Sequence, residues 1–455
     1  MASTWISRAA TGSVTSSTTF TFSFWIKRGT LDTTQYFFIH ENASGHTQKL
    51  ELLFQTDNTI RMGWYDGSSE YNYDTEMLFK DTSAWYNFVF RYDTTQSTDS
   101  DRVRMYVNGE QISYLNANGS SPTYMTQNKA MNLGQKVMVH GRYQSSNPGN
   151  YLTGSLSHIH YCDGQSYAPT SFGETDSTTG EWKIKANPSL TYGNNGYFIL
   201  KDGNSLTNQA GNSSGNFSVS GGTLTKTEDN PSNVFATFNP LSYRNNDSQR
   251  YVSFSEGNNT AVGNSSSNNG NAYSSLGASS GKFYCEFKAT DVRGTGYPNI
   301  GFMSEAGVNR TNGSGGQIST QGGTAYLPNG RLFVDGSETA SWGASFTDND
   351  IIQLAMDLDN GALYFGKNGT WQSSGNPASG ASKTGAARSF TPDGTFQFFG
   401  VAVYESGCQV KANFGNGYFG TTAVSSAGTN ASGIGIFEYD TPTGYTALST
   451  KGLNL

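Results

Sequence analysis

Apolar and polar residues alternate with a period of two through much of this chain, in short runs that end at turn residues. In the first run, Phe20, Phe22, Phe24 and Ile26 fall on one face and Ser23 falls on the other. Such alternation is typical of a half-buried β-strand. Similar runs occupy residues 36–39, 50–54, 59–65, 85–92, 102–107 and 151–161. The pattern predicts a β-sandwich over residues 1–164.

A second group of strand-like runs lies at residues 281–287, 299–303, 348–359, 362–367 and 397–403. Asn108-Gly109 and Asn360-Gly361 predict tight hairpins, one in each group. Between the groups, turn residues dominate and apolar residues are sparse, which is typical of a linker. We therefore expect an all-β chain with two antiparallel β-sandwich (jelly-roll) modules, 1–164 and 250–416. A loop-rich connector, 165–249, joins them, and a C-terminal extension, 417–455, follows.

Composition supports this fold class and excludes several functions. The 455 residues include 55 Gly, are 13% aromatic and only 14% charged, and carry a net charge of −7. No basic run is present, so we expect no nucleic-acid partner, and no apolar run approaches the length of a membrane span. The N-terminus has no signal-peptide pattern, which predicts synthesis in the cytoplasm. Three distant cysteines, Cys162, Cys285 and Cys408, form neither a disulfide framework nor a zinc motif.

Several motifs carry a family resemblance. Four segments together resemble the laminin-G-like, concanavalin A-like lectin jelly roll: residues 22–28, 84–89, 103–109 and 154–156. The hairpin at 348–367, with 281–287 before it and 397–403 and 413–415 after it, resembles a SPRY-type sandwich. The connector motifs at 162–165, 172–176, 194–198 and 229–241 are similar to those of marine bacteriophage structural or fibre proteins, and so is the tail at 441–453. The resemblance implies a phage setting and two recognition-type modules.

The lectin-like jelly roll also carries retaining glucanases, which need two closely spaced carboxylates. The segment with Glu70, Asp74 and Glu76 is the only match to their acid pattern, and Asn72 occupies the middle acid position. A hydrated strand edge explains these residues better, so we expect no catalytic residues and no enzymatic activity. His158 and His160 share a strand face, and no third ligand other than Asp163 lies nearby in sequence, which favours a structural pair.

Calcium is the metal that the rim of a lectin-like jelly roll would suit. Asp93, Asp99 and Asp101 form an acidic loop whose hard oxygen ligands match Ca²⁺. The same residues are also typical of a solvated hairpin loop, and no other cofactor is indicated.

Glycan binding requires an aromatic platform together with hydrogen-bonding side chains. The residues of the first module that best fit this requirement are Trp64, Tyr65, Asp66, Tyr71 and Tyr73. Any one of these aromatics could instead belong to a sandwich core.

We therefore expect a phage virion appendage of the tail-fibre or adhesion type that binds host-surface polysaccharide. We expect it to be located in the virion, in contact with other virion proteins and as a homo-oligomer, without membrane insertion. The alternative is an architectural protein, for capsid decoration or fibre anchoring, without glycan binding. A glycan hydrolase is the third hypothesis.

Overall fold

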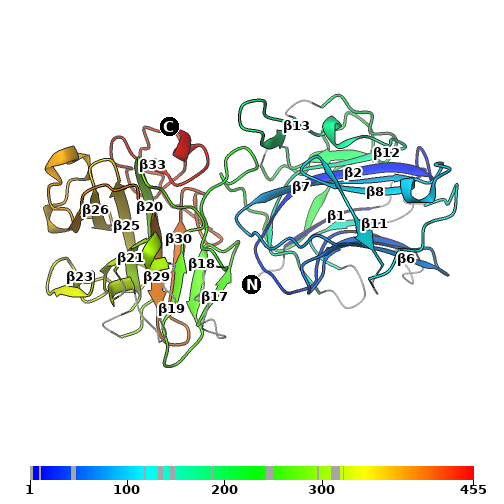
Figure 1. The fold of residues 1–455 in the computed structure, drawn as a ribbon. Helices are drawn as coiled ribbons and strands as arrows, with labels where there is room; N and C mark the ends of the chain where they lie inside the picture. The colour runs from blue at the N-terminus through cyan, green and yellow to red at the C-terminus, as the bar shows by residue number, and fades with distance from the viewer. Residues whose placement is uncertain are drawn as a thin grey trace. The chain divides into compact units, whose positions relative to one another are not determined.

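The chain folds as two compact units, Met1–Lys226 and Thr227–Leu455, each a β-sandwich (Figure 1). The computed structural model describes residues 4–9, 12–41, 48–116, 119–131, 137–143, 149–185, 188–201, 203–241, 251–294, 297–308, 318–320 and 322–455. Within these ranges α1 (Glu305–Val308) is the α-helix and the other regular elements are strands or short 3-10 turns. The all-β fold class is confirmed.

The first unit contains two large antiparallel sheets. The eight-stranded sheet has the order β10-β6-β5-β4-β3-β11-β1-β16, and the six-stranded sheet has the order β15-β12-β2-β7-β8-β9. Their strands are β1 (Trp5–Arg8), β2 (Thr19–Arg28), β3 (Gln35–Glu41), β4 (Lys49–Phe54), β5 (Ile60–Tyr65), β6 (Glu70–Thr75), β7 (Trp85–Asp93), β8 (Val103–Val107), β9 (Glu110–Ile112), β10 (Tyr114–Leu115), β11 (Val137–His140), β12 (Gly154–Asp163), β15 (Tyr197–Ile199) and β16 (Ser218–Gly221). A small separate sheet pairs β13 (Gly173–Thr175) with β14 (Trp182–Ile184).

Alternation places the apolar face of each strand between the two sheets. Phe20, Phe22, Phe24 and Ile26 of β2 are all at most 3% exposed and belong to the main core. They pack with residues of the opposite sheet, for example Phe22 with Phe38, whose ring centroids are 4.5 Å apart. The hydrophobic effect on these aromatic side chains is the main force that holds the sandwich together.

Residues 165–226 belong to the first unit, although the sequence predicted a connector there. Strand β15 pairs with β12, and β16 pairs with β1. The buried Arg8 guanidinium donates to the carbonyl of Asn195 at 2.7 Å and to the Ser214 hydroxyl at 2.9 Å. A second apolar cluster, which includes Phe172, covers the outer face of the six-stranded sheet. The segment therefore adds strands to both sheets, and its few apolar residues cover the outer face of the six-stranded sheet.

The second unit is also a sandwich of two sheets. The nine-stranded sheet has the order β17-β18-β30-β20-β25-β26-β27, with β28 beside β26 and β33 beside β20. The six-stranded sheet has the order β19-β29-β21-β22-β23-β24. Their strands are β17 (Val252–Ser255), β18 (Thr260–Gly263), β19 (Gly270–Tyr273), β20 (Lys282–Asp291), β21 (Asn299–Ser304), β22 (Thr324–Tyr326), β23 (Leu332–Val334), β24 (Ser337–Thr339), β25 (Ile351–Asp357), β26 (Ala362–Lys367), β27 (Thr370–Trp371), β28 (Arg388–Ser389), β29 (Gln397–Val403), β30 (Gln409–Asn413) and β33 (Thr446–Ala447). A short hairpin pairs β31 (Tyr418–Phe419) with β32 (Thr422–Ala423).

The predicted C-terminal extension is built into this second sandwich. Strand β33 lies parallel to the first half of β20, and Ala236 donates its N–H to the carbonyl of Leu448 at 2.9 Å. The buried carboxylate of Glu286 on β20 accepts the backbone N–H groups of Glu438 and Tyr439, both at 2.8 Å. The unit thus begins at residue 227 and uses the tail to close one sheet. Among the described residues, no helix has the length and apolarity of a membrane span.

Candidate functional site

The register of β5 and β6 decides the orientation of the predicted aromatic platform. Trp64 lies opposite Tyr71, and Met62 lies opposite Tyr73. Trp64 is 2% exposed, Tyr71 8% and Tyr73 0%, and all three belong to the main core. They cannot form a platform for a ligand, because their rings fill the space between the sheets. The prediction that these three residues bind a glycan is therefore wrong.

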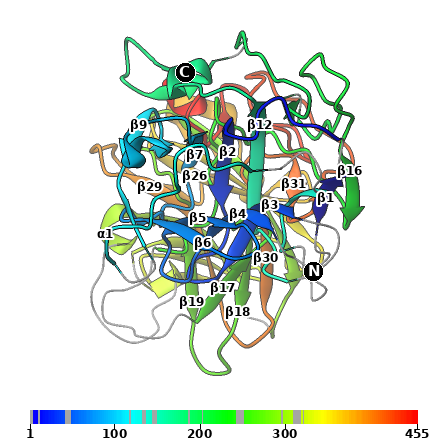
Figure 2. The same ribbon diagram turned by 90° about the vertical axis from the view of Figure 1, so that its right-hand side faces the viewer.

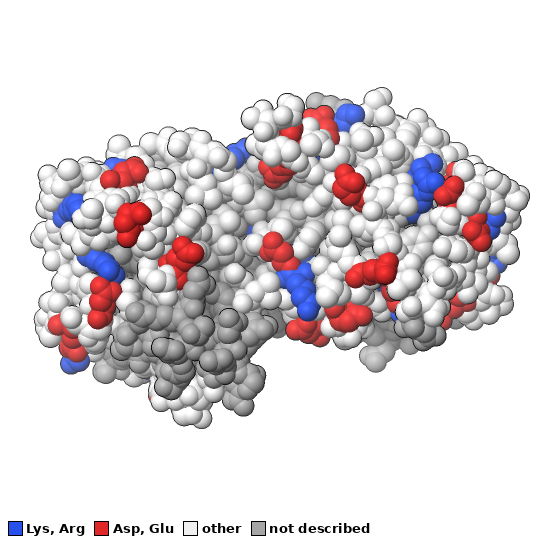
Figure 3. Space-filling model, in the orientation of Figure 1, with Lys and Arg blue, Asp and Glu red and all other residues white. Residues whose placement is uncertain are grey.

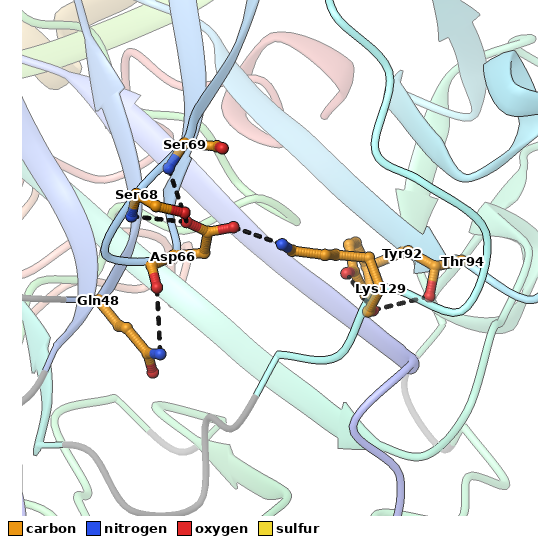
Figure 4. A network of polar contacts seen from close by, with 7 residues as sticks. All are labelled: Gln48, Asp66, Ser68, Ser69, Tyr92, Thr94 and Lys129. Atoms are coloured by element: carbon orange, nitrogen blue, oxygen red, sulfur yellow. Dashed lines mark hydrogen bonds and ion pairs between the residues drawn. The ribbon is translucent and has the colours of Figure 1, made fainter.

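Tyr65 and Asp66, the other two predicted residues, lie elsewhere. Tyr65 is half-buried and points to the outer face of the sheet, opposite Glu70. Asp66 lies in the turn after β5, where its Oδ1 accepts the N–H groups of Ser68 and Ser69 at 2.8 and 2.7 Å (Figure 4). Its Oδ2 accepts a hydrogen bond from Lys129, which with these N–H groups lowers the pKa of Asp66.

The Lys129 contacts connect the two sheets rather than form an open site. Its Nζ lies 5.8 Å from the centroid of the Tyr71 ring, and its carbonyl accepts the hydroxyls of Tyr92 and Thr94, both at 2.9 Å (Figure 4). Tyr92 belongs to β7 of the six-stranded sheet, whereas Asp66 and Tyr71 come from the eight-stranded sheet. Asp66 therefore contributes to a structural clamp at the edge of the sandwich.

The predicted calcium loop is closed by an arginine. Arg102 donates from Nε to the carbonyl of Gln96 at 3.0 Å, from Nη2 to that of Ser97 at 2.9 Å and from Nη1 to that of Met125 at 2.7 Å. These are the kind of backbone oxygens that would ligate Ca²⁺. A fixed guanidinium supplies the positive charge instead.

The three predicted calcium ligands have other partners or positions. Asp93 is 8% exposed and accepts hydrogen bonds from Thr95 and Gln96. Asp101 forms an ion pair with Arg104 at 2.6 Å, and Asp99 lies in the exposed 3-10 turn Asp99–Asp101. Within the described ranges, no three acidic, histidine or cysteine side chains are arranged to hold a metal ion.

The remaining candidates for chemistry are also engaged. Asp74 accepts hydrogen bonds from Nε and Nη2 of Arg61, both at 2.7 Å. Glu70 is exposed at the start of β6. His160 is fully buried against Phe198 and bonds the Tyr192 hydroxyl at 2.9 Å, and burial holds its pKa well below the ordinary value. His158 contacts the Ser157 hydroxyl at 2.7 Å. Neither histidine is placed as an open ligand.

The outer faces of the four large sheets differ in character. Three carry buried apolar clusters, which contain Phe198 on the six-stranded sheet of the first unit, Tyr284 on the nine-stranded sheet and Met303 on the six-stranded sheet of the second unit. On the outer face of the eight-stranded sheet, Ile39, Leu53 and Val139 are at most 5% exposed, but the described residues form no such cluster. Its strands β3 to β6 run side by side (Figure 2) and display charged and tyrosine side chains.

We call this surface the polar face, and six residues define it: Tyr36, Lys49, Glu51, Arg61, Asp74 and Tyr143. Tyr36 of β3 packs against Tyr143, with ring centroids 4.7 Å apart and planes tilted by 46°. Lys49 pairs with Glu51 at 2.7 Å, and its Nζ lies 5.7 Å from the centroid of the Tyr143 ring. Cross-strand pairing sets Arg61 directly opposite Asp74.

The electrostatics of these six residues show that they form one cluster. Burial raises the pKa of Tyr36, and the Glu51 carboxylate raises it further, while Arg61 opposes the shift. Burial lowers the pKa of Lys49, but the charge and hydrogen bond of Glu51 outweigh burial, so the net shift is upward. The hydrogen bond with Asp74 raises the pKa of Arg61. The face therefore keeps its two cations charged and its two tyrosines neutral across the ordinary pH range.

A second aromatic–cation contact extends the same side of the sheet. Arg142, next to Tyr143 in the chain, places its guanidinium carbon 3.6 Å from the centroid of the Trp5 ring. Trp5 precedes the core residue Ile6 on β1, so it points outward. Residues 142 and 143 thus lie over the outer side of β1 and β3.

Comparison with known proteins agrees with the first module's fold. A family model described as the concanavalin A-like lectin/glucanases superfamily (Laminin_G_3) matches residues 2–163. The predicted lectin-like jelly roll is therefore confirmed over this segment. No curated protein matches the chain in sequence.

Three solved structures that are similar to parts of the chain illustrate what the comparison finds. A heptameric SAP-like pentraxin from Limulus polyphemus is 16% identical, with a TM-score of 0.26, and the match covers 37% of this chain and 72% of that chain. The SPRY domain of human HERC1 is 21% identical, with a TM-score of 0.25 and coverage of 34% and 87%. The CBM40 of the Ruminococcus gnavus IT-sialidase, bound to α2,3 sialyllactose, is 13% identical, with a TM-score of 0.27 and coverage of 36% and 94%.

Proposed function

We propose that the polar face of the first unit is a glycan-binding surface. The observation that carries the proposal is the Tyr36–Tyr143 pair beside two ion pairs, Lys49–Glu51 and Arg61–Asp74. Aromatic rings pack against the apolar C–H face of a sugar, and charged pairs offer both donors and acceptors to its hydroxyls. The lectin-like family match to residues 2–163 supports the same function.

We further propose that the chain binds glycan without cleaving it. A retaining glycosidase needs one carboxylate that is free to act as nucleophile and another that carries a proton. Asp74 is held by both donor groups of Arg61, and Glu51 is held by Lys49. Both carboxylates are thus engaged in ion pairs, so neither is free to act as the nucleophile.

The biological setting that we propose is a phage virion appendage that attaches to host-surface polysaccharide. The support is the resemblance of the connector motifs at 162–165, 172–176, 194–198 and 229–241 to those of phage proteins. Immunogold labelling of purified virions tests this setting. Label at the tail or fibre tips supports attachment, label spread over the head favours a decoration protein, and unlabelled particles contradict a virion location.

The binding site itself is tested by tyrosine substitutions in the full chain. Tyr36→Ala or Tyr143→Ala removes half of the aromatic pair, and loss of one anchor ring costs on the order of 1–2 kcal/mol, about 5- to 30-fold in Kd. The matched control is Tyr404→Ala, because Tyr404 also stacks on a tyrosine, Tyr297, with centroids 4.8 Å apart, but in the second unit.

The readout is a glycan array followed by calorimetric titration of the best ligand. We expect the two polar-face variants to lose affinity while the control retains it. Equal affinity in all three variants would remove the polar face as the binding site. Hydrolysis of the bound glycan by the parent protein would contradict binding without cleavage.

A further inference from the structure

The charges of the polar face are already neutralised within the molecule. Lys49 and Glu51 pair at 2.7 Å, with side chains 21% and 5% exposed, and Arg61 and Asp74 pair at 2.7 Å, with side chains 21% and 12% exposed. In both pairs the cation is the more exposed partner. The groups that a ligand meets are therefore mainly N–H donors whose positive charge is compensated by the paired carboxylate.

The surrounding charged residues do not restore a positive potential. Among the described residues of this outer face, Arg142 adds a positive charge and the exposed Glu70 adds a negative one, so together they leave the balance of charge unchanged. The whole chain has a net charge of −7, and acidic and basic side chains are interspersed on the molecular face drawn in Figure 3. An approaching anion gains little from such a surface, because opposite charges a few ångströms apart cancel beyond a Debye length.

Uncharged hydroxyl groups match this arrangement better than anions do. A sugar hydroxyl accepts a hydrogen bond from the outward Lys49 or Arg61 nitrogens and donates its own proton to a carboxylate or tyrosine oxygen. We infer that the polar face selects neutral glycans, chains of uncharged hexoses, over glycans that carry carboxylate or sulfate groups. This inference rests on the proposed glycan-binding function and specifies its ligand class.

The first test compares matched ligands on the full chain. A neutral oligosaccharide and the same backbone with a uronate or sulfate substituent are titrated at low and high salt. An anion loses part of its hydration on this face without meeting a net positive charge, so we expect the neutral ligand to bind more tightly, by about threefold. We expect its Kd to stay within about twofold between 50 and 500 mM salt, because no net charge is neutralised on binding.

A charge-unmasking variant makes the test specific to these residues. Asp74→Asn removes the carboxylate paired with Arg61 and leaves a guanidinium with an uncompensated charge. We expect this variant to gain affinity for the acidic ligand by about three- to tenfold, in a manner that high salt abolishes. Asp176→Asn is the control, because it makes the same charge change in an exposed ion pair away from the polar face, with Lys183 at 3.1 Å. We expect no change in selectivity from the control.

The outcomes separate this inference from the proposed function. If the parent protein prefers the acidic ligand and high salt removes that preference, the inference is wrong while glycan binding stands. If the parent binds neither ligand class on a broad array, both are overturned. Should Asp74→Asn unfold, Glu51→Gln performs the same unmasking at Lys49, and unchanged selectivity in a folded variant contradicts the assignment.

Discussion

Adjacent residues on β5, Trp64 and Tyr65, give a sharp test of which aromatic side chains belong to the core. Trp64 is 2% exposed and lies between the sheets, whereas Tyr65 is half-buried on the outer face. Trp64→Ala removes a large ring from a closely packed interior and leaves a cavity. Tyr65→Ala removes a ring of similar chemistry from the opposite side of the same strand, so it is the natural control.

The expected magnitude follows from burial. A buried Trp→Ala substitution costs about 3–5 kcal/mol of unfolding free energy, the transfer term plus the cavity term. The first unit has 226 residues. In that size range, 1 kcal/mol shifts Tm by about 2–4 °C, so we expect Trp64→Ala to lower the first unit's Tm by roughly 6–20 °C. We expect Tyr65→Ala to change the unfolding free energy by less than about 1 kcal/mol.

Differential scanning calorimetry of the full chain measures both effects, because the second unit provides an internal reference. Glycan titration well below the lowered Tm measures binding by the folded variant. We expect Trp64→Ala to destabilise the first unit and to leave the affinity of the folded protein nearly unchanged. A variant with unaltered Tm and lost glycan binding would refute the inward orientation of Trp64 and return it to the binding surface.

Three further substitutions test other parts of the structure. Arg102→Met removes three hydrogen bonds to carbonyl oxygens, so we expect a loss of about 2–4 kcal/mol in chemical denaturation, whereas EDTA should not shift the parent's midpoint. Burial raises the pKa of Glu286 to about 7 from 4.5, so the folded state binds the proton more tightly. The contribution of Glu286 to the unfolding free energy should therefore be greatest below pH 4.5. It should fall by about 3 kcal/mol as the pH rises past 7. Glu286→Gln should reduce this pH dependence, as measured by denaturation at a series of pH values. Arg8→Met should lower the first unit's Tm in calorimetry through loss of its bonds to Asn195 and Ser214, and an unchanged Tm would mean that residues 165–226 do not support the sandwich.

Alternation predicted the strands well because it reports a local property. The run from Phe20 to Ile26 lies within β2, residues 59–65 contain β5 and residues 102–107 contain β8. The same alternation also predicts where the aromatic residues point. Ile60, Met62 and Trp64 lie on the same face of their strand, and a face with mainly apolar residues points to the core. Residue type alone does not separate the core residues Trp64, Tyr71 and Tyr73 from aromatic residues on the surface, whereas their position in the alternation does.

Local sequence pattern does not predict all of the contacts among the residues of the polar face. Arg61 and Asp74 meet through the β5–β6 register, which a hairpin prediction could have supplied. Tyr143 reaches Tyr36 from more than 100 positions away, in a segment without strand alternation. Such long-range pairing depends on tertiary packing, which the pattern of a single sequence does not predict.

The same reasoning explains why residues 165–226 and the C-terminal tail seemed to lack a fold of their own. Each contributes strands of two to four residues, too short for a periodic signal, and these strands pair with strands that lie earlier in the chain. A single sheet layer cannot bury both of its sides, so three outer faces need a cover and receive one from chain that is poor in apolar residues. The described outer side of the eight-stranded sheet has ion pairs and tyrosines around the buried Ile39, Leu53 and Val139, which belong to no apolar cluster. Charged pairs gain nothing from a dry cover, because burial would cost their hydration. That face is thus suited to stay accessible, which is why a ligand-binding role is best sought there.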